Sequence, residues 1–136
     1  MEKTIVWKPE MSVGVEEIDN QHKQFIEIIS NFYQAFNNSR VEEELGGILK
    51  RLIEYAVFHF ETEEQYFDKF NYELKDDHKK KHDELKVKVL NFKERFEKEG
   101  SIMIPEFTEF LIDWLVNHME DEDQKYVKCF HEHGLV

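Results

Sequence analysis

Cysteine is almost absent from this chain of 136 residues, which contains only Cys129. A single thiol cannot form an internal disulfide and is typical of a protein from a reducing compartment. Long apolar runs are also missing, and none of those present could span a bilayer. The N-terminus lacks the basic and then apolar pattern of a signal peptide. We therefore predict a cytoplasmic protein that does not enter the membrane.

Basic residues are too few to balance the acidic ones. The sequence has 18 Lys and Arg against 30 Asp and Glu, which gives a formal net charge of −12. Nucleic acid and anionic membranes both require a basic footprint, so this balance argues against either partner. The only basic run, residues 79–81, lies between two histidines and would face away from them on a helix. We interpret it as a solvated face.

Strand alternation and hairpin signals are absent, and the apolar patterns have helical spacing. Residues 1–18 predict an extended arm whose apolar side chains, Ile5, Val6, Trp7, Val13 and Val15, pack on the body of the protein. Four amphipathic segments follow the arm, joined by short connections. These features predict a single all-α domain over residues 1–136, with residues 19–136 forming an antiparallel up-down-up-down four-helix bundle.

Local signals mark the ends of the four predicted helices. The first would start with Asp19 as its N-cap and end near Asn37. The second would start at a capping box of Ser39 and Glu42 and end within residues 69–72. The third would stop at Gly100, a natural residue after a helix end. The fourth would begin near Pro105 and continue to Gly134.

Histidines replace apolar residues on the inward stripes of all four predicted helices. They are His22, His59, His78, His82 and His118, and two carboxylates, Glu63 and Asp123, accompany them. Two pairs, His59 with Glu63 and His78 with His82, are four residues apart and so project from one helix face. The pair His118 and Asp123 is five apart. On a helix these two diverge more, although the carboxylate can still reach a second metal.

In an antiparallel bundle, all these positions lie within roughly 20 Å of the same end. Burial of so many imidazoles and carboxylates would be costly without a metal. Nitrogen and oxygen donors without a thiolate suit iron, and this set is too large for one ion. We therefore predict a two-iron site that binds a small diatomic ligand. His131 and His133 lie beyond the inward stripe and are predicted to be exposed.

The stretches around these residues resemble the hemerythrins, specifically the bacterial single-domain type (bacteriohemerythrins). The matching stretches are residues 19–23, 59–64, 78–82 and 114–118 with Asp123, together with the arm that carries Trp7 and residues 13–15. The resemblance implies that His78, His82 and His118 bind one iron and that His22 and His59 bind the other. It further implies that Glu63 and Asp123 bridge the irons, one oxygen to each, beside an oxo or hydroxo group.

The resemblance also implies a function without catalysis. Dioxygen would bind reversibly, as hydroperoxide on the five-coordinate two-histidine iron, for storage, delivery or sensing. An oxygen-using enzyme or a reductant is the kind of protein partner to expect. Helical offsets and the resemblance together nominate the walls of an oxygen pocket: Phe25, Phe60, Trp114, Leu115 and Met119. Met119 departs from the branched aliphatic residue more usual there, and we hypothesise that its thioether speeds autoxidation.

Three other functions stay open at this point. A di-iron redox enzyme or scavenger could act on peroxide or nitric oxide, although the E-x-x-H motif of ferritin-like oxidases is absent. A zinc protein would be expected to show H-E-x-x-H or a cysteine cluster, and neither occurs. A metal-free interaction module would keep its stability when metal is removed, whereas a folding-coupled metal site would lose stability.

Overall fold

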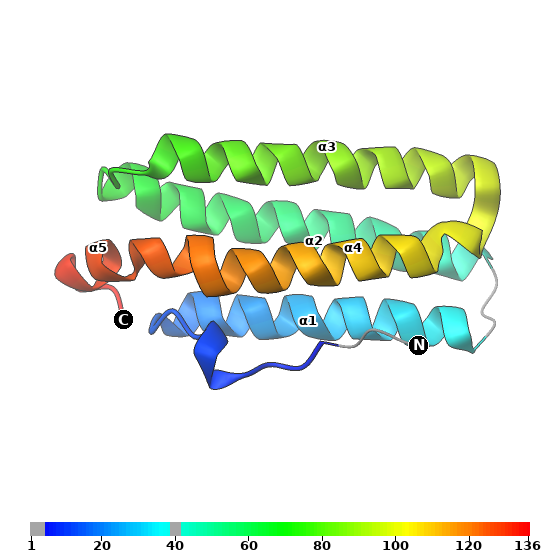
Figure 1. Cartoon of the computed structure of the whole chain (residues 1–136), viewed down its shortest axis with the longest axis horizontal. Helices are drawn as coiled ribbons and strands as arrows, with labels where there is room; N and C mark the ends of the chain where they lie inside the picture. Colours follow the sequence, from blue (N-terminus) through cyan, green and yellow to red (C-terminus); the bar gives the residue numbers. More distant parts are fainter. Residues whose placement is uncertain (1–4, 39–41) are drawn as a thin grey trace.

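The computed structural model describes residues 5–38 and 42–136, which form four long helices running antiparallel (Figure 1). The helices are α1 (Glu16–Asn37), α2 (Glu42–Lys69), α3 (Lys75–Glu99) and α4 (Ile104–Asn117). A 3-10 turn, η2 (Gly100–Met103), precedes α4. A π-helical turn η3 (His118–Glu122), a 3-10 turn η4 (Asp123–Tyr126) and α5 (Val127–Glu132) follow it. The predicted all-α, up-down-up-down bundle is confirmed, and no strand occurs in the described residues.

Two apolar clusters fill the bundle, one large and one small. The large cluster runs between the four long helices and includes Phe32, Leu49 and Phe107. The small cluster closes the end at which α1 and α3 begin, and it consists of Val13, Val15, Ile18, Phe67, Tyr72, Tyr126 and Phe130. Its members come from the arm, the start of α1, the end of α2 with the turn that follows it, and the segment after α4. Any polar group between the two clusters is therefore cut off from water.

The arm is partly as expected and partly different. Ile5, Met11, Val13 and Val15 are buried, but Val6 is 67% exposed, so its predicted packing is wrong. A 3-10 turn, η1 (Pro9–Met11), interrupts the extended chain. The exposed side chain of His131 approaches the Gly14 carbonyl oxygen at 3.0 Å and links the arm to α5. His131 and His133 are both exposed, as predicted.

The start of α1 corrects the sequence prediction. The helix begins at Glu16, three residues before the expected start, and Asp19 lies within its first turn. Asp19 is not an N-cap, because its carboxylate accepts hydrogen bonds from Ser12 Oγ (2.6 Å) and from the backbone N–H of Val13 (2.9 Å). An acidic residue in the first turn is still favoured by the helix dipole. Here it also anchors the arm to the bundle.

The remaining helix ends are mostly where the sequence places them. α1 ends at Asn37, and α3 ends at Gly100, whose φ of +75° suits a residue without a side chain. The predicted cap Ser39 lies outside the described residues. Within the described part, no helix has the length and apolarity needed to cross a bilayer.

The predicted fourth helix is not continuous. α4 stops at Asn117 and gives way to the π-helical and 3-10 turns before α5 resumes. The prediction failed because the apolar stripe resumes at Val127 and Phe130, which hides the change of helix type between them. This change occurs at His118 and Asp123, two of the predicted site residues.

Candidate metal centre

Seven polar side chains converge at one end of the bundle, between the two apolar clusters. α1 contributes His22, α2 contributes His59 and Glu63, α3 contributes His78 and His82, and the turns after α4 contribute His118 and Asp123. All seven are buried, and the most exposed of them, His118, is only 5% exposed. Their ligand atoms form two groups, and within each group these atoms lie within 4.8 Å of one another. Glu63 belongs to both groups.

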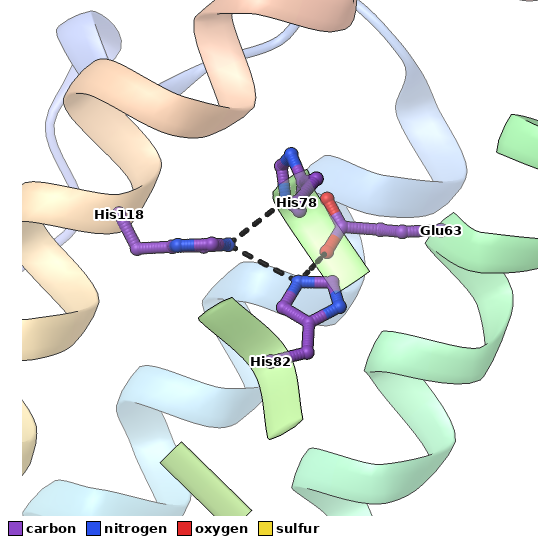
Figure 2. A group of neighbouring side chains, drawn as sticks. All are labelled: Glu63, His78, His82 and His118. Carbon is purple, nitrogen blue, oxygen red and sulfur yellow. Dashed lines mark hydrogen bonds and ion pairs between the residues drawn. The ribbon is translucent and has the colours of Figure 1, made fainter. Parts of the chain in front are cut away.

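One group consists of three imidazoles and Glu63 (Figure 2). His118 Nε2 lies 3.0 Å from His78 Nε2 and 3.1 Å from His82 Nε2. His82 Nε2 also lies 3.4 Å from Glu63 Oε1. Three ring nitrogens that face one another leave at least two lone pairs aimed at the same point. This is the arrangement that a shared cation relieves.

The other group consists of two imidazoles and both carboxylates. His22 Nε2 lies 3.2 Å from Asp123 Oδ2, and His59 Nε2 lies 3.3 Å from Glu63 Oε1. The rings of His22 and His59 meet edge to face, with their centroids 4.5 Å apart. This group therefore has one imidazole fewer than its neighbour and more carboxylate.

The π-helical turn explains how His118 and Asp123 face the same point. In an α-helix, side chains five residues apart point about 140° away from each other. A π turn closes its hydrogen bond over five residues and so brings such a pair back into line. Asp123 Oδ1 lies 3.1 Å from the Nε2 atoms of both His78 and His118, while its Oδ2 faces His22. One carboxylate thus spans both groups.

Glu63 is oriented differently from the expectation of one oxygen toward each iron. Its Oε1 alone faces both groups, between His59 and His82. Its Oε2 accepts a hydrogen bond of 2.6 Å from the buried Tyr126 hydroxyl. The sequence analysis missed Tyr126, which lies one helical turn beyond Asp123 on a stripe that reads as ordinary core.

Two further side chains hold imidazoles from behind, and neither was predicted. His82 Nδ1 lies 2.8 Å from a carboxylate oxygen of Glu64, and His59 Nδ1 lies 2.8 Å from the amide oxygen of Gln21. Gln21 Nε2 in turn donates to Thr62 Oγ1 at 3.2 Å, which fixes which end of the amide is the oxygen. Both partners are acceptors, so Nδ1 carries a proton in each ring and Nε2 is the nitrogen that faces the centre.

Protonation differs between the histidines of the metal-free protein. Burial lowers the pKa of His59 below its ordinary 6.5. Burial acts in the same direction on His82, but hydrogen bonds to Glu63 and Glu64 outweigh it and raise the pKa of His82 to about 9. The pKa of His22 is also raised, because the Asp123 carboxylate outweighs burial.

The two central carboxylates stay ionised. Burial raises the pKa of Glu63 and Asp123, and for Glu63 the neighbouring Asp123 charge adds to this rise. The facing imidazoles more than reverse it and hold the pKa of both groups well below the usual range. Ionised carboxylates beside ring nitrogens with free lone pairs form the donor set that a cation requires.

Three of the five residues predicted to line an oxygen pocket contact the imidazoles. The Phe60 ring stacks on His82 with centroids 4.0 Å apart, and the Trp114 ring stacks on His118 at 4.3 Å. Phe25 meets His59 edge to face at 6.4 Å. Leu115 and Met119 are fully buried in the same apolar cluster. The centre is thus walled by apolar side chains on this side.

The centre also contains polar atoms that its own side chains do not satisfy. Five buried atoms lack a hydrogen bond, namely both ring nitrogens of His22, Oε1 of Glu63 and both carboxylate oxygens of Asp123. Buried polar atoms without partners are rare and costly in native proteins. Cations bound in the two groups would satisfy four of these atoms, so the residues present fit a metal site.

Comparison with known proteins agrees with this geometry. The family described as the hemerythrin HHE cation binding domain matches residues 13–130, nearly the whole chain. The chain belongs to the hemerythrin family. The resemblance drawn from the sequence is therefore confirmed at the level of the family, and with it a domain class that binds metal cations.

Individual hemerythrin relatives cover most of the chain. A bacteriohemerythrin of Clostridium acetobutylicum is 32% identical over 127 residues, which cover 90% of this chain and 98% of the relative. A bacteriohemerythrin of Methylococcus capsulatus is 30% identical and covers 88% of this chain and 91% of its own length. A wild-type hemerythrin crystal structure superposes with a TM-score of 0.86 at 29% identity, covering 93% of this chain and 98% of that one.

Proposed function

We propose that this hemerythrin-family chain binds dioxygen reversibly at a pair of iron ions. One ion would be held by His78, His82 and His118, and the other by His22 and His59, with Glu63 and Asp123 shared between them. The observation that carries this proposal is the position of Asp123, whose two oxygens face different groups of imidazoles 3.1 Å and 3.2 Å away. A site for one cation would not need a carboxylate that spans two donor groups.

The donor set supports iron over other metals. Imidazole nitrogen and carboxylate oxygen suit iron in both of its common oxidation states, and no thiolate takes part. When bound, a pair of iron ions would provide the two electrons that reversible dioxygen binding requires. The protein would position the imidazole and carboxylate donors, fix which of them carry protons, and exclude water from the site.

The unequal division of histidines supports a ligand-binding position in the two-histidine half. Three imidazoles and the shared carboxylates leave less room at one ion, whereas two imidazoles leave a position open at the other. An exogenous ligand would therefore bind at the half built by His22 and His59. Phe25 lies against His59 on that side.

The apolar wall supports binding without turnover. Phe60 and Trp114 cover His82 and His118, and both Leu115 and Met119 are inaccessible to water. Exclusion of water and of stray protons prevents side reactions of a reduced ligand. The Tyr126 hydroxyl is held by Glu63 and its pKa is raised well above 10 by burial, so it stays protonated.

Metal loading and gas uptake test the proposal together. The chain would be loaded anaerobically with ferrous iron, its metal content counted, and its dioxygen uptake measured with an oxygen electrode. We expect two irons and one dioxygen per chain, with recovery of the gas under vacuum. A chain that holds zinc as readily and takes up no dioxygen when loaded with iron would overturn the proposal.

A further inference from the structure

An apolar groove opens on the surface between α2 and α3. Its volume is about 130 Å³ and its lining surface is entirely apolar. Ala56, Leu85 and Val89 form buried walls, whereas Leu90 lies at the rim and is 52% exposed. Lys86 reaches the same rim and contributes its aliphatic stem, because its amino group pairs with a neighbouring carboxylate on α3.

The groove ends at the candidate metal centre. Phe60, only 1% exposed, is part of the lining and is also the residue whose ring stacks on His82 at 4.0 Å. The Trp114 ring also packs against Phe60, with ring centroids 5.8 Å apart. A single aromatic ring therefore separates the groove from an imidazole of the centre.

Size and chemistry restrict what the groove can hold. A closed apolar cavity of similar volume takes up xenon or small apolar molecules, and the buried walls of this groove offer the same kind of surface. The groove is too small for a peptide segment or an amphipathic helix. Two larger hollows of about 370 and 390 Å³ are lined by charged side chains, among them Glu17, Glu61, Lys125 and Glu132. Those hollows suit polar ligands, whereas an apolar diatomic molecule is better accommodated in the groove.

We propose that the α2–α3 groove is a binding and entry site for small apolar gas molecules, and that movement of the Phe60 ring admits them to the centre. The role in dioxygen entry rests on the proposed function, but the binding of an apolar gas in the groove does not. The groove reaches inward as far as the Phe60 ring, whose centroid also lies 5.9 Å from that of His59 in the two-histidine half.

Xenon tests the binding site without reference to iron. Crystals of the whole chain would be pressurised with xenon, and the same experiment repeated with Ala56→Leu, which fills the groove. We expect a xenon atom against Phe60 in the unmodified chain and none in Ala56→Leu. A matched control is Ala35→Leu on α1, a half-buried alanine packed against the core far from the groove. Absence of xenon from the groove of the unmodified chain would overturn the proposal.

Association kinetics test the entry role. Reduced, iron-loaded protein would be mixed with dioxygen in a stopped-flow instrument, using Ala56→Leu and a rim variant, Leu90→Trp. We expect both to slow association and dissociation by about tenfold while the equilibrium affinity stays unchanged, because a blocked path changes rates and not end states. Val87→Trp controls for a large aromatic on α3, since Val87 is exposed but does not line the groove.

The outcomes separate this inference from the proposed function. If iron-loaded protein takes up no dioxygen while xenon occupies the groove and is lost in Ala56→Leu, the proposed function fails and the gas site stands. If dioxygen binds and both blocking variants associate at the unmodified rate, the entry role is overturned and the proposed function is unaffected.

Discussion

The two halves of the candidate centre use the same side chain in different surroundings. In the three-histidine half, His82 is held by the Glu64 carboxylate and its pKa is raised to about 9. In the two-histidine half, His59 is held by the neutral amide of Gln21 and its pKa is lowered. Both rings are buried, so burial alone does not set their charge. Hydrogen bonds to Glu63 and Glu64 outweigh burial and raise the pKa of His82, whereas burial prevails at His59, which has the neutral Gln21 amide behind it.

This difference fits a division of labour between the halves. A carboxylate behind an imidazole makes the ring more basic and a stronger donor to a cation of high charge. On the proposed function, the three-histidine half would hold its ion firmly. The two-histidine half has a neutral partner behind His59 and fewer imidazoles, so it would be the half that takes the ligand.

The largest expected effect comes from removing the carboxylate that joins the halves. Asp123→Asn would leave the facing imidazoles without their shared negative charge, so we expect the iron content to fall from two per chain to one or none. We also expect the metal-free chain to lose about 3–5 kcal/mol of stability, because a buried pair is broken. Metal analysis and urea unfolding measure the two effects. Asp121→Asn, an exposed neighbour, is the control, and two irons retained in Asp123→Asn would refute the shared role.

Exchanging the groups behind the imidazoles sharpens the comparison. Glu64→Gln would weaken donation by His82, and we expect metal affinity at the three-histidine half to fall about 10-fold to 100-fold. Gln21→Glu would strengthen His59, and we expect the midpoint potential of the two-histidine iron to fall. Competition with a chelator and spectroelectrochemistry measure these changes, with the exposed Glu61→Gln as control. If both halves respond equally to each variant, Glu64 and Gln21 do not cause the difference between the halves.

A change of pH should affect His82 and His59 differently. The His82 pKa of about 9 lies above its ordinary 6.5, so its pairing stabilises the metal-free chain fully below pH 6.5 and is lost as pH rises through 9. Metal binding must displace that proton, so metal affinity should rise over the same interval. His59, with its lowered pKa, adds no such dependence above pH 6.5. Titration of metal affinity from pH 6 to 9 checks this, and Glu64→Gln should flatten the curve.

The smallest expected effect concerns Met119 in the apolar wall. Met119→Ile keeps the volume nearly constant, so stability should change by less than about 1.5 kcal/mol. We expect autoxidation of the oxygenated protein to slow, because a stiffer, branched side chain closes the wall. The decay of the oxygenated spectrum measures this rate. An unchanged rate would show that Met119 does not affect autoxidation.

The sequence predicts most of the fold because the helices are long and their apolar stripes are regular. Spacings of four residues within α2 and α3 place His59 with Glu63 and His78 with His82 on one helix face. The antiparallel arrangement of the helices then brings these faces together at one end of the bundle. The start of α1 was misplaced because Asp19 has the chemistry of an N-cap but uses it to bind Ser12 and Val13 in the arm. A local pattern does not reveal such a tertiary partner.

The site is less predictable where it depends on distant contacts. The five-residue spacing of His118 and Asp123 signals an irregular turn, but it does not say that the turn is π-helical. Gln21 and Glu64 adjoin predicted ligands in sequence, yet nothing distinguishes them from other acidic and amide residues until the chain has folded. Tyr126 is indistinguishable from a core aromatic in the sequence. The orientation of Glu63 depends on that hydroxyl and could not be foreseen.

Reversibility of oxygenation is the most direct test of the central claim. The iron-loaded chain would be reduced without oxygen, exposed to dioxygen and then purged, with the visible spectrum recorded at each step over several cycles. The account predicts a charge-transfer band that appears with dioxygen and disappears on purging, with two irons per chain throughout. An immediate and permanent conversion to the oxidised form would contradict reversible binding and favour a redox enzyme or scavenger acting on peroxide or nitric oxide.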